Sequence, residues 1–118
     1  MNKDILLKNK IDVPQALERF AHNEAMYQKY LLRFEEDKSF KNLETAIKDK
    51  EYYLAFQAAH TLKGIAGNLS LTPLYEKMCD LVTYLRDSSD IQKAELIFPQ
   101  VCELYEQTVQ TIRESAKE

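Results

Sequence analysis

One histidine of this chain stands among neighbours that could support chemistry. Lys63, Gly64 and Gly67 follow His60 within a single segment of helical periodicity. At about 100° per residue, these four residues fall on the same side of a helix. A neutral imidazole nitrogen is a competent nucleophile toward a phosphoryl group, and a lysine one turn away offsets the charge on the phosphoryl oxygens. The spacing therefore favours a site that carries a phosphoryl group on His60.

The two glycines of the chain, Gly64 and Gly67, both lie on this face. Each is expected to cost about 1 kcal/mol relative to alanine in a helix interior. What glycine offers in return is the absence of a side chain. We therefore expect another group to approach the helix backbone closely beside His60.

Aromatic and amide side chains extend the same face on both sides of His60. Tyr53 and Phe56 precede the histidine by two turns and one turn, and exposed aromatic side chains next to a polar group are typical of docking sites. The alternative is that Phe40 or the N-terminal helix folds over them. Gln57 is a candidate for orienting the imidazole. The residues predicted to bind a partner are Tyr53, Phe56, Gln57, Gly67 and Asn68.

The rest of the chain supplies no machinery for making or breaking ATP. It has no glycine-rich loop and no pair of carboxylates at metal-ligand spacing, and His22 has no neighbours like those of His60. We interpret His22 as part of a helix end. The sequence predicts a phosphocarrier that is not an enzyme in its own right and that has no metal or cofactor of its own.

Composition limits the fold and the kinds of partner. The 118 residues are 45% hydrophobic and 30% charged, which suits one globular domain. With only two glycines and three prolines, hairpins are disfavoured, so we expect an all-α fold. No apolar run approaches the roughly 18 residues of a membrane span, and the first residues open no secretory signal, so a cytoplasmic location without membrane insertion is expected. The net charge of −3 with interspersed signs argues against nucleic-acid binding.

Periodicity and capping signals divide the chain into helical segments. Asp12 and Asn23 are predicted N-caps, Thr72 and Ser89 mark further helix starts, and Pro99 is expected to kink the last helix. The predicted architecture is an antiparallel up-and-down four-helix bundle with additional short N-terminal helices covering one end. Residues 1–10 are predicted to be a frayed lead-in, and residues 11–118 a single helical-bundle domain. The expected helices cover residues 13–21, 24–37, 40–48, 51–69, 73–87 and a long last segment that begins near residue 89.

The segment from Ala58 to Leu69, AAHTLKGIAGNL, resembles the signature of histidine-containing phosphotransfer (HPt) domains. The resemblance covers roughly residues 11 to 112. It implies a four-helix bundle whose exposed histidine takes a phosphoryl group from the aspartate of one response-regulator receiver domain and passes it to another. By this resemblance His60 is the phosphoacceptor, Lys63 compensates charge, and Gly64 gives clearance for the receiver, which brings the Mg²⁺. Receiver domains and hybrid sensor histidine kinases are the implied partners of a monomeric domain.

Two positions depart from the family pattern. Ser70 stands where many members have a second glycine, and Val82 stands where some members have a polar residue that hydrogen-bonds to the imidazole. The alternative function is a helical interaction module that binds or sequesters a response regulator without phosphotransfer. An enzyme that uses His60 as a general base is disfavoured, because no second catalytic group is visible.

Overall fold

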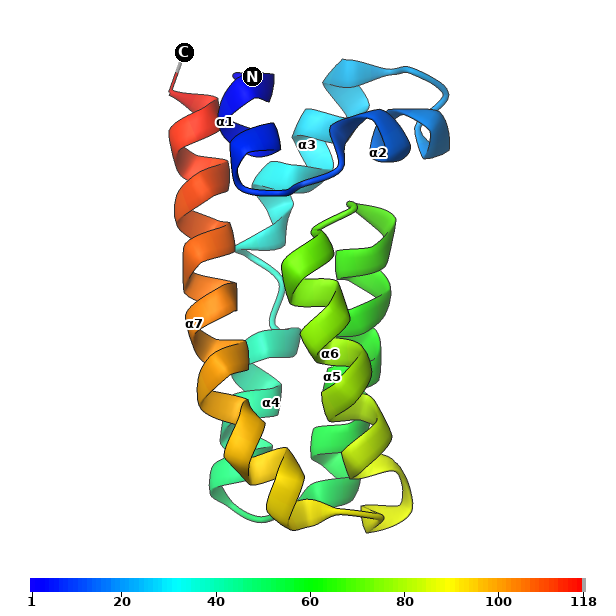
Figure 1. Cartoon of the computed structure of the whole chain (residues 1–118), viewed down its shortest axis with the longest axis vertical. Coiled ribbons are helices and arrows are strands. Elements are labelled where there is room, and N and C mark those ends of the chain that lie inside the picture. The colour runs from blue at the N-terminus through cyan, green and yellow to red at the C-terminus, as the bar shows by residue number, and fades with distance from the viewer. Residues whose placement is uncertain (118) are drawn as a thin grey trace.

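The computed structural model describes residues 1–117, which are helical with short turns and contain no strand (Figure 1). The all-α prediction is confirmed. Helix boundaries agree closely with the periodicity in the middle of the chain, where the predicted segment 51–69 forms α5. The elements are α1 (Lys3–Lys8), α2 (Val13–Arg19), α3 (Glu24–Phe34), α4 (Ser39–Lys48), α5 (Tyr52–Asn68), α6 (Thr72–Leu85), the 3-10 turn η1 (Arg86–Ser88) and α7 (Ile91–Ala116).

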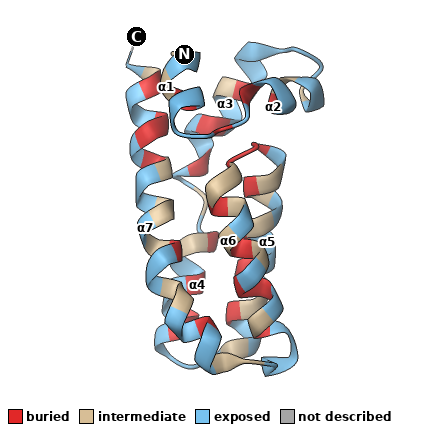
Figure 2. Ribbon diagram, viewed as in Figure 1, coloured by how far each residue is buried: buried red, intermediate tan, exposed pale blue. Residues whose placement is uncertain are grey.

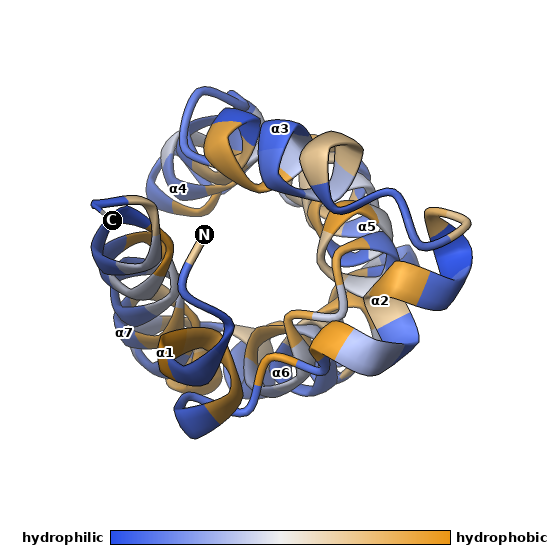
Figure 3. Ribbon diagram, turned by 90° about the horizontal axis from the view of Figure 1, so that it is seen from above, coloured by the Kyte–Doolittle hydropathy of each residue, from blue (hydrophilic) through white to orange (hydrophobic). Residues whose placement is uncertain are grey.

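The molecule measures 41 × 24 × 21 Å. Its longer helices lie side by side along the longest axis (Figure 1). Helix α4 packs against α5, α5 against α6, and α6 against α7, while α1 and α3 both contact α7. The helices α1, α2 and α3 lie at the end of the molecule where α7 finishes (Figure 1). Viewed end-on, the long helices surround a common axis and α2 lies on the outer side of α5 and α6 (Figure 3). Pro99 lies inside α7, whose axis bends along its first half.

Buried apolar side chains from all seven α-helices form one core cluster (Figure 2). Helix α5 contributes mostly small residues to it, namely Ala55, Ala59 and Ala66, together with Leu62. Small side chains let α5 lie close to α4 and α6 on either side. Because these neighbours cover only part of α5, the remaining face, which carries His60, stays open to solvent.

The predicted frayed lead-in over residues 1–10 is wrong. Residues Lys3–Lys8 form α1, whose Asn2 N-cap side chain accepts a hydrogen bond from the Ile5 backbone N–H. The Asn2 N–H donates to the Ser115 carbonyl in α7, and Leu6 is fully buried in the core. Burying a leucine contributes roughly 1.5–3 kcal/mol, which is enough to order a short terminal helix.

A buried tyrosine ties α3 to the turn between α5 and α6. The Tyr27 hydroxyl donates a hydrogen bond to the Leu69 carbonyl at 2.8 Å. In a continuing helix that carbonyl would accept from the residue four positions on, but this residue is Pro73, which has no N–H. Burial raises the pKa of Tyr27 above the usual tyrosine range. The hydroxyl therefore satisfies a carbonyl that the α6 backbone cannot.

Replacing Tyr27 by phenylalanine is expected to lower the free energy of unfolding by about 1–3 kcal/mol, the usual cost of leaving a buried acceptor without a donor. Urea unfolding followed by circular dichroism measures the change. Tyr30→Phe, on the same helix but with an exposed side chain, is the matched control and should leave stability nearly unchanged. Equal effects of the two substitutions would contradict this role of the Tyr27 hydroxyl.

The raised pKa of Tyr27 also gives the stability a pH dependence. Because the folded state holds the phenol proton more tightly than the unfolded state, this contribution is present in full below about pH 10 and is lost as the pH rises above it. The stability difference between the wild type and Tyr27→Phe should therefore narrow as the pH rises from 9 to 11. A difference that is constant over this range would contradict the raised pKa.

Candidate functional site

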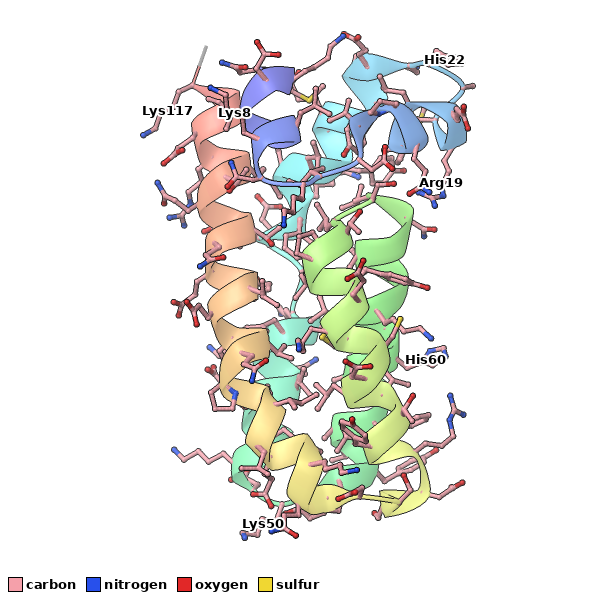
Figure 4. The ribbon with its side chains drawn as sticks, viewed as in Figure 1. Lys8, Arg19, His22, Lys50, His60 and Lys117 are labelled. Carbon is pink, nitrogen blue, oxygen red and sulfur yellow. The ribbon has the colours of Figure 1, made fainter. Side chains whose placement is uncertain are left out.

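His60 lies in the middle of α5 with its side chain exposed. Figure 4 shows the imidazole projecting from α5 into solvent, halfway along the molecule, while His22 lies at the far end beside α2. The ring contacts Phe56, whose ring centroid is 6.0 Å away. A histidine placed in this way is accessible to a second protein across a broad face.

The backbone next to His60 is open at Gly64. A Cβ atom built at this position meets no heavy atom within 4 Å outside its own helix. Lys63, one turn from His60, is half-buried, and its long side chain can extend its ammonium group toward the same opening. No packing reason within the described chain accounts for a glycine at position 64, so the clearance faces outward.

Gly67 has a different role. A Cβ atom at this position would lie 3.0 Å from Cε1 and 3.2 Å from Cδ1 of Tyr75, which belongs to α6. The close approach that the sequence predicted here therefore comes from within the chain. Gly67 allows the Tyr75 ring to approach the backbone of α5 closely, whereas Gly64 leaves open space beside the helix.

Phe56 is half-buried and packs against the core. The Arg86 guanidinium carbon lies 5.1 Å from the centroid of its ring, at the distance of a cation–π contact. The alternative that the N-terminal helix covers Tyr53 and Phe56 is wrong, because α2 lies at the other end of α5, where Arg19 reaches the Asn68 carbonyl at 3.5 Å. Arg86 adds a second cation near His60.

Arg86 was missed at the level of sequence. It follows α6 at the start of η1, so only the packing of α6 along α5 places it over Phe56. Its neighbours Asp87 and Ser88 both have positive φ, at 51° and 53°, which turns the chain sharply after Arg86. The sequence feature that could have indicated Arg86 is its position as a basic residue at the C-terminal end of α6, the helix that follows α5.

Tyr53 is 71% exposed at the start of α5. Gln57 donates from its Nε2 to the Tyr53 hydroxyl at 3.2 Å. No hydrogen bond joins Gln57 or any other group of residues 1–117 to the His60 ring, so the structure does not bear out Gln57 as the group that orients the imidazole. Val82 is only 2% exposed and belongs to the core.

A groove of about 620 Å³ adjoins the histidine face at Lys63, Gly64 and Gly67. Its far wall includes Arg19 and Ser70. The exposed residue Asn68 also lines it, at the last position of α5. The groove thus extends the open surface from His60 toward α2.

Ser70 lies in the turn after α5 and forms part of this wall. Its backbone φ is 56°, a left-handed conformation that favours glycine. The side chain compensates: Oγ accepts from Arg19 at 2.7 Å and donates to Gln15 Oε1 at 2.8 Å. Ser70 therefore links α2 to the end of the histidine helix.

Within residues 1–117 no group of three or more histidine, cysteine, aspartate or glutamate side chains is placed to hold a metal ion. Over the same residues, no helix combines the length and hydropathy needed to cross a membrane. Comparison with protein-family models, with curated proteins and with solved structures found no match. The function must therefore be inferred from the residues of the chain and their geometry.

Proposed function

We propose that this chain is a histidine-containing phosphotransfer domain. In this proposal His60 accepts a phosphoryl group from the aspartyl phosphate of a receiver domain and passes it to the aspartate of a second receiver. The observation that carries the proposal is the exposed imidazole of His60 beside the open backbone at Gly64. A receiver must bring its aspartate to the imidazole, and a side chain at position 64 would stand in its way.

The chemistry requires little from this chain beyond positioning. A lone pair on one imidazole nitrogen of His60 attacks the phosphorus of the acyl phosphate, the bond from phosphorus to the aspartate oxygen breaks, and the aspartate leaves as a carboxylate. The new phosphohistidine first carries the proton of the other ring nitrogen as an imidazolium. The ammonium of Lys63 offsets the charge on the transferring oxygens. Transfer to the next receiver is the reverse of these steps.

Arg86 extends the positive potential on the N-terminal side of His60. It lies over Phe56, and the ring of Phe56 contacts that of His60. A receiver active site is rich in carboxylates, so cations on both sides of the imidazole favour its approach. Tyr53 and the exposed edge of Phe56 supply apolar contact area, and Asn68 lies at the far end of the same face.

We regard α4, α5, α6 and α7 as an up-and-down four-helix bundle with α1, α2 and α3 covering one end, which their order of packing supports. The protein acts as a monomer in the cytoplasm, with a response regulator or a hybrid sensor histidine kinase as partner. The receiver supplies the Mg²⁺.

The test combines binding with transfer. A panel of receiver domains is charged with acetyl phosphate and Mg²⁺, mixed with the protein, and followed both for complex formation by calorimetry and for loss of the aspartyl phosphate. Phosphoryl transfer from at least one receiver supports the proposal. Binding to receivers with no transfer from any of them would contradict it and would favour a module that sequesters the response regulator.

Lys63→Ala is expected to slow phosphotransfer by roughly 10- to 100-fold without abolishing it, because one charge that stabilises the transferring group is lost while the nucleophile remains. Single-turnover kinetics with a charged receiver measure the rate. Lys8→Ala is the matched control, since Lys8 is an exposed lysine of α1 at the far end of the molecule (Figure 4). An unchanged rate for Lys63→Ala would remove its proposed role.

A further inference from the structure

A groove of about 1010 Å³ lies where α2 and α3 meet the C-terminal end of α5. Phe20, Phe34, Ile65 and Leu69 contribute to its apolar lining, and His60 is not among its residues. The volume stands at the upper end of the roughly 300–1,000 Å³ typical of sites for small ligands. The proposed phosphotransfer reaction makes no use of this groove.

Two large apolar side chains of α3 are exposed on one wall of the groove. Met26 is 45% exposed and Tyr30 is 44% exposed, and both line the groove. The ring of Tyr30 lies 5.6 Å from that of Phe20, so the two form a continuous aromatic surface. An adaptable methionine next to aromatic rings suits the apolar body of a ligand.

Two arginines add positive charge to this apolar surface. Arg19 and Arg33 both line the groove, and among residues 1–117 neither guanidinium forms an ion pair with a carboxylate. Arg33 lies 5.7 Å from the centroid of the Tyr30 ring. Asp37 also lines the groove, and its carboxylate accepts a hydrogen bond from the Ser39 N–H at the start of α4. With two guanidinium groups and one carboxylate among its lining residues, the groove keeps a net positive charge to offer a ligand.

We propose that this groove binds an amphipathic organic anion, a ligand with an aromatic or alkyl body and one carboxylate, sulfonate or phosphate group. The body lies against Phe20, Met26 and Tyr30. The anionic group faces Arg33, with Arg19 close by on the other wall. Charge complementarity selects this class, because within residues 1–117 no ion pair neutralises the positive charges of Arg19 and Arg33, and an uncharged apolar ligand would not neutralise them either. The site stands apart from His60, so failure of the phosphotransfer proposal leaves it untouched.

Two fluorescent probes test the proposal with the full chain. 8-Anilinonaphthalene-1-sulfonate carries one sulfonate, and N-phenyl-1-naphthylamine has the same ring system without it. We expect saturable binding of the sulfonate with one site per chain. Arg33→Gln should weaken this binding by about 3- to 10-fold and leave binding of the neutral probe unchanged. Lys29→Gln removes the same charge from an exposed position of α3 outside the groove, and should change neither.

A second pair of variants tests the apolar contact. Met26→Ala should weaken both probes, whereas Leu32→Ala, which removes a similarly exposed side chain of α3 outside the groove, should weaken neither. Absence of saturable sulfonate binding, or equal effects of Arg33→Gln and Lys29→Gln, would overturn the proposal. So would a receiver domain that shifts the Met26 methyl resonance when the sulfonate does not, because the groove would then belong to a protein partner.

Discussion

Substitution of His60 by glutamine is expected to abolish phosphoryl transfer from every receiver that charges the wild type. Glutamine keeps a polar side chain of similar reach but has no nitrogen lone pair able to attack phosphorus, so the loss should be complete. Because His60 is exposed and no group of residues 1–117 hydrogen-bonds to its ring, the substitution should leave the fold unaffected. The rate is measured with a charged receiver, and the fold by circular dichroism and thermal unfolding.

His22→Gln is the matched control for this prediction. His22 is also exposed, but it lies in the α2–α3 turn with a φ of 61°, far from His60 (Figure 4). This variant should transfer at the wild-type rate. If His60→Gln binds receivers with unchanged affinity while transfer is lost, the imidazole acts in chemistry and not in docking. Wild-type transfer by His60→Gln would place the phosphoacceptor elsewhere.

Gly64→Phe is expected to weaken receiver binding by at least about 10-fold and to slow transfer accordingly, while the melting temperature stays nearly constant. The new ring would project into space that is empty in the free protein, because a Cβ atom at this position meets nothing within 4 Å. Helix propensity by itself favours phenylalanine over glycine by a few tenths of a kcal/mol, so no destabilisation is expected. Calorimetric titration with a receiver and thermal unfolding measure the two quantities.

The second glycine supplies the contrast. Gly64→Ala should raise the free energy of unfolding by about 1 kcal/mol, the ordinary gain in a helix interior. Gly67→Ala should fall short of that gain or lose stability, because its Cβ atom would press on the Tyr75 ring at 3.0 Å. A large loss of stability in Gly64→Phe would make Gly64 a packing residue as well, and the clearance argument would fail.

Local signals in the sequence predicted most of the helices. Asp12 and Asn23 cap α2 and α3 as expected, each accepting a hydrogen bond from the backbone N–H three residues on. Thr72 and Ser89 do not cap, because neither stands at an N-cap position: Thr72 is the first residue of α6 behind Leu71, and Ser89 precedes Asp90. Their hydroxyls donate to the Ser70 and Thr83 carbonyls. Asp90 caps α7 in place of Ser89. Both predicted helix starts are therefore one residue away from the observed N-cap.

The face that carries His60 followed from helical periodicity, but its surroundings did not. Leu54, an apolar residue of α5, is 53% exposed and lines a groove together with Thr45 and Ala46 of α4. The contact of Arg86 with Phe56 and the approach of Tyr75 to Gly67 depend on how α6 lies along α5. Such contacts join residues far apart in the chain, and the periodicity of a single helix has no information about them.

The location of the phosphoryl group tests the central claim most directly. The wild type is incubated with a receiver charged by acetyl phosphate and Mg²⁺, digested at alkaline pH, and its peptides are fragmented in a mass spectrometer. The account predicts one phosphoryl group, on His60, that is stable in base and lost in acid, as expected of a phosphorus–nitrogen bond. A phosphoryl group on another residue, or an unmodified His60 after a receiver has bound and discharged, would contradict it.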